Sequence, residues 1–140
     1  MISNTTTSVY SALEEAINVS SHALGFVLSI VALGALLRYS VPGGDILKIV
    51  SVTIFGCSLV IAYGTSTAYH SSRLPLRRSR LRIMDHASIY ILIAGTYTPF
   101  ALVVLQGSIG WIILGVSWGI AIVGITLKIF FTGRYQLLST

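Results

Sequence analysis

The sequence predicts an all-α membrane protein, a polytopic bundle of transmembrane helices. Its mean hydropathy is +0.86 and 9% of its residues are charged, whereas a soluble domain averages about 25% charged residues. The 140 residues give room for four spans of roughly 20 residues with short connections. Because the only cysteine, Cys57, lies inside an apolar run, a disulfide framework and a paired-thiol metal site are excluded.

Four apolar runs, separated by turn-forming or charged segments, supply the expected spans. They cover residues 16–37, 49–69, 87–105 and 109–127. Before the first run, Ser11-Ala12-Leu13-Glu14 has the pattern of a capping box, in which Ser11 and Glu14 satisfy N–H groups at the start of a helix. Inside the third run, Pro99 has no N–H to donate to Gly95 and is expected to kink the helix.

Five of the nine basic residues lie in one short stretch between the second and third runs. They are Arg73, Arg77, Arg78, Arg80 and Arg82. By the positive-inside rule this stretch is a cytoplasmic loop, so both termini are expected in the cytoplasm. This placement accounts for the net charge of +5 without nucleic acid as a partner. Contact with anionic lipid headgroups is a further role that the arginines suggest.

That topology brings polar residues of three helices to the same, cytoplasmic end of the bundle. They are Glu15, Asn18 and His22 at the start of the first run, Ser66 and His70 at the end of the second, and Asp85 before the third. The three residues of the first run are spaced to share one helix face, as are the two of the second. Ionisable groups at bilayer depth are costly and mark a functional site by default.

These residue types suggest a metal site. His70 is the candidate ligand, because a neutral imidazole is the commonest metal ligand in proteins, with Ser66 and Asp85 holding a metal-bound water. A catalytic zinc site needs three protein ligands plus that water, and a third ligand is hard to find here. Other interpretations stay open. His22 is suited to a hydrogen bond between helices, and His70 and His86 to positions at the lipid headgroups.

The polar motifs also resemble those of a known family. Glu15-x-x-Asn18-x-x-x-His22, then Ser66-Thr67-Ala68-Tyr69-His70, then Asp85-His86 and the run over residues 89–100, are similar to motifs of the hemolysin III family. This family is the bacterial branch of the progestin and adipoQ receptor (PAQR) membrane proteins. The resemblance covers the chain from Leu13 onward. It implies a seven-helix bundle in the bacterial inner membrane, with these four spans as its amino-terminal part.

The resemblance further implies a zinc ion at the cytoplasmic side. Its ligands would be His70 and two histidines of an H-x-x-x-H motif on the last helix, with Ser66 and Asp85 holding the metal-bound water. No histidine follows His86, and the sequence stops after four spans. We therefore expect a fragment of a longer protein or a natural truncation. The zinc site of these 140 residues is then incomplete, with two histidine ligands absent.

Three functions follow from these observations. The first is zinc-dependent hydrolysis of an amide-containing lipid, which a similarity to membrane ceramidases implies. The second is a pore-forming or membrane-perturbing cytolysin, which the family name favours, and the third is a membrane-stress sensor without chemistry. The sequence feature that separates the first from the others is an H-x-x-x-H on a later helix. Membrane lipids are the expected partners, and the sequence predicts no oligomeric state.

Overall fold

The chain forms four long helices joined by short turns. The computed structural model describes residues 12–135, with side chains described as far as residue 130. The elements in order are α1 (Ala12–Ser40), the 3₁₀-helix η1 (Val41–Gly43), α2 (Ile46–Ser71), α3 (Pro75–Pro99), the π-helix η2 (Phe100–Leu105) and α4 (Gly107–Tyr135). Four helices are long and apolar enough to cross a membrane. The all-α prediction is therefore confirmed.

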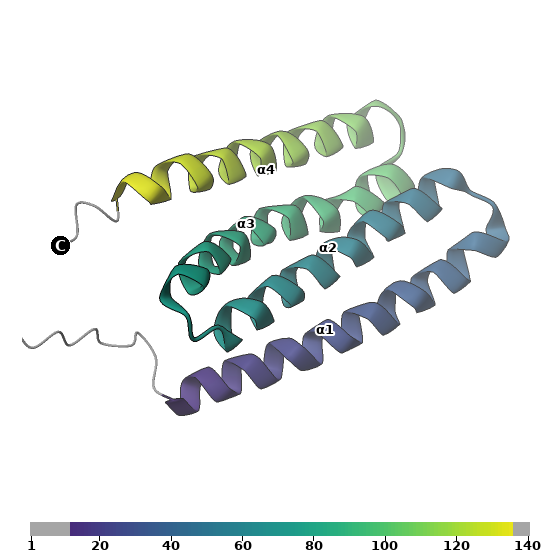
Figure 1. Cartoon of the computed structure of the whole chain (residues 1–140). Coiled ribbons are helices and arrows are strands. Elements are labelled where there is room, and N and C mark those ends of the chain that lie inside the picture. Colours follow the sequence, from purple (N-terminus) through teal and green to yellow (C-terminus); the bar gives the residue numbers. More distant parts are fainter. Residues whose placement is uncertain (1–11, 136–140) are drawn as a thin grey trace, which may run out of the picture.

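The helices pack in chain order, each antiparallel to the one before it (Figure 1). The contacts between helices are mainly those of α1 with α2, α2 with α3, and α3 with α4. The amino-terminal end of α1, the carboxyl end of α2 and the amino-terminal end of α3 consequently lie at the same end of the bundle. This arrangement brings the polar motifs of three separate helices to one membrane face.

The third helix begins about three turns earlier than the sequence analysis predicted. The five arginines were expected in a loop before residue 87, but α3 starts at Pro75, and only Arg73 remains in the connection. Proline suits the first position of a helix, where its missing N–H is not needed. Arginine stems also tolerate a helix at the membrane surface, because their charged ends reach the headgroups. Of the predicted capping box, Ser11 lies outside the described residues.

The third span changes its hydrogen-bond pattern at Pro99. The α-helix ends there and continues as the π-helix Phe100–Leu105. Thr98 Oγ1 donates to the Ala94 carbonyl oxygen (2.8 Å) and accepts a bond from the Trp118 indole N–H (3.1 Å). The region around the proline is therefore tied to both α3 and α4.

Small residues form the interior of this bundle, and large apolar residues cover its outside. The buried residues include Ser29, Ser51, Ser58, Ser66, Ser88, Thr98, Ala94, Ala101 and Ala121. All four helices carry exposed leucine, isoleucine or valine side chains, and most of those that are more than half exposed lie on α1 and α4. This distribution is the one expected for helices that meet through small residues and face lipid with large ones.

Two kinds of glycine distinguish the packed and open faces of the helices. A Cβ added to Gly95 on α3 would come within 2.7 Å of the Ser58 Cβ on α2, so this glycine allows close approach of the two helices. The sequence marks Gly115 and Gly119 on α4 as a GxxxG packing signal. Both are exposed, and an added Cβ at either would meet no atom of the described residues within 4 Å.

Candidate functional site

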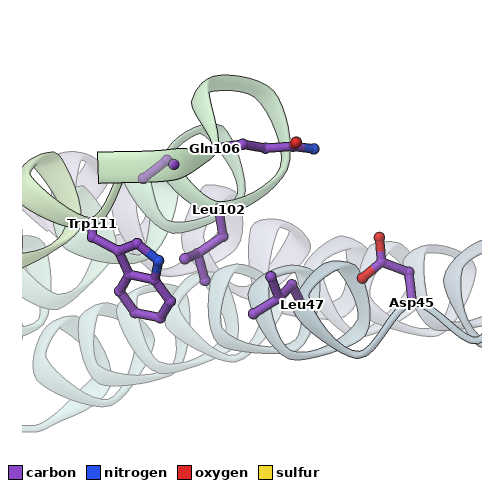
Figure 2. Close-up of a pocket in the computed structure, with 7 residues that line it drawn as sticks. Asp45, Leu47, Leu102, Gln106 and Trp111 are labelled. Atoms are coloured by element: carbon purple, nitrogen blue, oxygen red, sulfur yellow. The ribbon is translucent and has the colours of Figure 1, made fainter. Parts of the chain in front are cut away.

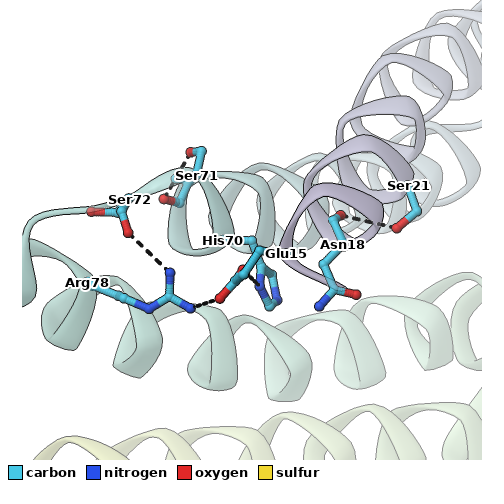
Figure 3. Close-up of polar contacts among 8 residues, drawn as sticks. Glu15, Asn18, Ser21, His70, Ser71, Ser72 and Arg78 are labelled. Carbon is cyan, nitrogen blue, oxygen red and sulfur yellow. Dashed lines mark hydrogen bonds and ion pairs between the residues drawn. The ribbon is translucent and has the colours of Figure 1, made fainter. Parts of the chain in front are cut away.

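The polar cluster at one end of the bundle is centred on a contact between α1 and α2. The Glu15 carboxylate lies 2.9 Å from His70 Nδ1, joining residues 55 positions apart in the sequence (Figure 3). Because a carboxylate only accepts hydrogen bonds, Nδ1 is the donor. In the neutral form of the imidazole, the lone pair then lies on Nε2. The His70 side chain is 9% exposed and that of Glu15 is 23% exposed, so the contact is largely removed from solvent.

Arg78 of α3 completes the contact between three helices. Its guanidinium forms an ion pair with the second carboxylate oxygen of Glu15, and its other terminal nitrogen donates to the Ser72 carbonyl oxygen (3.2 Å). Figure 3 shows the arginine between the α2–α3 turn and the glutamate. Arg78 therefore balances the Glu15 charge and fixes the turn that follows His70.

Ring contacts hold the His70 imidazole from two further directions. The His22 ring of α1 stacks almost parallel to it, with centroids 5.6 Å apart and 4° between the planes. The Tyr69 ring lies 4.7 Å away at a tilt of 56°, and the Arg78 guanidinium sits 4.8 Å from the centre of that tyrosine ring. These contacts and the Glu15 hydrogen bond leave the imidazole little rotational freedom.

Ser66 lies one helical turn before His70, on the same face of α2. It is 7% exposed. The neighbouring Thr65 and Thr67 each donate their hydroxyl to a carbonyl one turn earlier. The Ser66 hydroxyl forms no such bond within the described part of the chain, so it remains available to a group bound between Ser66 and His70.

Asp85 comes to the same depth from α3. The Thr65 and Ser88 hydroxyls are hydrogen bonded at 3.0 Å and set the register of the two antiparallel helices. Asp85 is three residues before Ser88 and therefore lies level with Ala68 of α2, within one turn of His70. Its carboxylate forms no hydrogen bond or ion pair with the residues whose side chains are described.

The two remaining polar positions of the motifs show hydrogen bonds within their own helices. His86 Nδ1 donates to the Arg82 carbonyl oxygen of its own helix (2.7 Å). This bond gives the His86 imidazole a structural role within α3. Asn18 lies one turn from Glu15 on α1, and its backbone carbonyl oxygen accepts a bond from the Ser21 hydroxyl (3.1 Å, Figure 3).

The described residues could supply part of the ligand set of a zinc site. His70 has the donor type, and a carboxylate holds its other ring nitrogen, as is usual for a metal-binding histidine. A catalytic zinc needs three protein ligands. Among residues 12–135, no three histidine, cysteine, aspartate or glutamate side chains lie together where they could hold a metal ion. The described residues therefore offer one candidate ligand, His70, and no complete zinc site.

Arg78 is the member of this cluster that sequence reasoning missed. The arginine stretch was interpreted as a topology determinant, and its placement in a loop hid the direction of each side chain. Once α3 is extended to Pro75, Arg78 and Asp85 are seven residues apart and share one helix face. The signal in the sequence was Glu15, a carboxylate at a membrane end that needs a nearby cation.

A pocket lies at the opposite membrane end (Figure 2). It has a volume of about 270 Å³ and is lined by Asp45, Leu47, Ala101, Leu102, Gln106, Gly107 and Trp111. The polar groups there serve the backbone of their own turns. Asp45 accepts from the Lys48 N–H (3.2 Å), and the Gln106 amide donates to the Val103 carbonyl oxygen (3.0 Å). This pocket brings together no cluster of nucleophilic or metal-binding side chains within the described residues.

Comparison with known proteins identifies the family. The family model described as "Haemolysin-III related" matches residues 10–140. The chain belongs to the hemolysin III family. It is 44% identical over 132 residues to the hemolysin-3 homolog of Bacillus subtilis (strain 168), a match that covers 94% of this chain and 62% of the relative. It is 42% identical over 127 residues to hemolysin-3 of Bacillus cereus, covering 91% and 58%.

These matches establish a multi-pass membrane protein of this family. The chain spans about three fifths of the length of the curated relatives that it matches. No solved structure matches the chain. The family resemblance read from the polar motifs is thereby confirmed over nearly the whole sequence.

Proposed function

We propose that this protein acts in the zinc-dependent hydrolysis of an amide-containing lipid, with His70 as one zinc ligand. The observation that carries the proposal is the Glu15–His70 contact, in which the carboxylate accepts from Nδ1 and fixes the tautomer of the imidazole. Zinc, when bound, would polarise the amide carbonyl and supply hydroxide near neutral pH. The two further histidines that the family resemblance implies are not among these 140 residues.

Each residue of the cluster has a separate role in this proposal. Glu15 orients His70 and fixes its tautomer, and Arg78 balances the Glu15 charge. Ser66 presents a hydroxyl one turn from His70 on a buried face, and Asp85 is the proton acceptor. His22 holds the His70 ring by stacking. Asn18 is a supporting polar residue on the same face of α1.

The experiment compares zinc content and lipid-amide cleavage for matched variants of the protein expressed from its own gene. His70→Ala should lose the metal, because it removes a ligand. Asp85→Asn should keep most of the metal and lose cleavage, because an amide cannot accept a proton. Ser66→Ala should be milder, since losses around a metal site typically cost about 10–100-fold in affinity or activity. Purified residues 1–140 should bind zinc weakly or substoichiometrically.

His86→Ala is the matched control, because that imidazole is bonded to its own helix and should leave zinc content and cleavage unchanged. Tight one-to-one zinc on residues 1–140 would mean that other side chains of this chain are ligands. The hydrolase proposal is abandoned if Asp85→Asn retains full cleavage, or if metal-free protein is as active as metal-loaded protein.

A cytolysin is the second candidate, because one relative carries the name hemolysin-3 at 42% identity. Such an activity would work through helix packing and exposed apolar surface rather than through His70. In a haemolysis assay it would respond to Gly115→Leu on the open face of α4 and remain in His70→Ala. The hydrolase proposal expects the opposite pattern in a lipid-cleavage assay.

We further propose that the polar cluster faces the cytoplasm, with the protein in the inner membrane of a bacterium. Five arginines at the α2–α3 end support this orientation by the positive-inside rule, and their helical placement keeps them at the same membrane face. A reporter fused after Arg78 should behave as cytoplasmic, and one fused at Gly44 as external. The reverse labelling would exclude the orientation.

A further inference from the structure

A basic cavity lies at the turn between α2 and α3, beside the His70 cluster and distinct from it. Its volume is about 360 Å³, and it is lined by Ala68, Ser71, Ser72, Arg73, Leu74 and Arg77. We propose that this cavity binds the phosphate headgroup of an anionic phospholipid. The proposal does not depend on zinc or on the hydrolase function.

The charge of the cavity comes from two arginines that the fold does not use elsewhere. Arg73 and Arg77 are exposed, and neither forms an ion pair with the residues whose side chains are described. Arg78, one position further, is engaged by Glu15. Guanidinium groups bind phosphate oxygens in a forked geometry. The cavity thus offers two such groups without a competing carboxylate.

One residue that lines the cavity, Ser72, also carries a polar atom without a partner in the described part of the chain. The Ser72 hydroxyl oxygen is buried and has no hydrogen-bond partner in the described part of the chain. A buried polar group without a partner is costly, which points to a group absent from the protein itself. Arg78 fixes the Ser72 backbone by donating to its carbonyl oxygen (3.2 Å). The backbone of Ser72 is therefore fixed where this residue lines the cavity.

The start of α3 adds backbone donors on the same side. Its first helical residue is Pro75, which has no N–H, and the preceding Leu74 provides no side-chain cap. The N–H of Arg78 already bonds to the Leu74 carbonyl oxygen (2.8 Å). The N–H groups of Leu76 and Arg77 are left at the positive end of the helix, where anions bind.

The surroundings select a lipid as the source of the phosphate. The cavity joins the ends of two membrane-spanning helices, so it lies at the level of the headgroups. Leu74 and Leu76 beside it are 65% and 84% exposed, as suits residues that contact acyl chains. A cavity of this size exceeds one phosphate and is at the lower end of small-molecule sites. A soluble phosphate ion would make no use of the exposed leucines beside the cavity.

The experiment measures phosphatidylglycerol bound to the purified full chain in nanodiscs, against phosphatidylcholine alone. Arg73→Gln with Arg77→Gln should weaken retention of phosphatidylglycerol roughly thirtyfold. The matched control is Arg80→Gln with Lys128→Gln, which removes the same charge at the same membrane end outside the cavity, and it should weaken retention at least several-fold less. Ser72→Ala, which changes no charge, should also reduce retention roughly tenfold.

Three results would overturn the proposal. Equal losses in the two double variants would show a diffuse surface charge rather than a site. Unchanged retention in Ser72→Ala would remove the role of the buried hydroxyl. Inorganic phosphate that binds the lipid-free protein in detergent as tightly as phosphatidylglycerol does would make a soluble anion the ligand. Helical content measured by circular dichroism identifies any variant that has failed to fold, and Ser72→Ala then carries the test.

Discussion

The two membrane ends of this bundle use their polar residues in different ways. At the His70 end, Glu15 bonds to residues 55 and 63 positions away, and the contacts join three helices. At the opposite end, Asp45 and Gln106 bond to backbone groups three positions away. Each end carries a pocket and a hydrogen-bonded carboxylate, Glu15 at one end and Asp45 at the other. Only Glu15 bonds to other helices.

This difference between Glu15 and Asp45 distinguishes a candidate functional site from a residue that only stabilises a turn. The local bond from the Lys48 N–H to the Asp45 carboxylate satisfies a donor at the start of α2 and would form in an isolated helix. The Glu15 contacts exist only when α1, α2 and α3 are packed, and they fix the direction of a group with ligand chemistry. Cross-helix polar contacts among otherwise apolar helices are therefore the stronger indication of function.

The largest expected effect that tests this comparison is on stability. Glu15→Ala removes the partner of both His70 and Arg78 and leaves a half-buried guanidinium without its counter-charge. We expect the free energy of unfolding to fall by about 2–3 kcal/mol. Asp45→Ala at the other end should cost only about 1 kcal/mol, the usual value for a helix cap. Denaturation in mixed detergent micelles measures both.

A second variant sharpens the result. Arg78→Met alone should be destabilising, and the double variant with Glu15→Ala should cost less than the sum of the two single changes, because both remove one interaction. Strict additivity would mean that the ion pair contributes nothing. A larger cost for Asp45→Ala than for Glu15→Ala would reverse the comparison between the two ends.

The sequence was sufficient to predict the four helices and the meeting of Glu15, His22 and His70. Hydropathy fixes where helices cross the membrane, and short connections make neighbours antiparallel, so residues at matching ends must converge. These steps need no side-chain detail. The same topology argument predicted that Ser66 and Asp85 lie at the membrane depth of His70.

Features that depend on helix ends and close packing were not predictable in the same way. Charge alone suggested a loop around Pro75, because the pattern does not tell a solvated helix from a turn. The π-helix after Pro99 depends on how α3 meets α4. That Gly115 lies on an exposed face of α4 could not be predicted either, since a GxxxG pattern does not identify the helix that packs against it.

The smallest expected effect lies at the opposite end and has the reverse sign. Gln106 has a positive φ of 50°, the one described residue other than glycine that does, and its ψ of 177° belongs to a region used almost only by glycine. The hydrogen bond from its side-chain amide to the Val103 carbonyl oxygen is exposed and contributes little to stability.

Gln106→Gly should therefore raise the free energy of unfolding by about 0.5 kcal/mol, as relief of strain exceeds the entropy cost of glycine. Gln106→Val should lower it by about 1–2 kcal/mol, because a β-branched residue fits this backbone poorly. Equal stability for the two variants in the same micelle assay would mean that the turn relaxes, and that this end is less rigid than the His70 end.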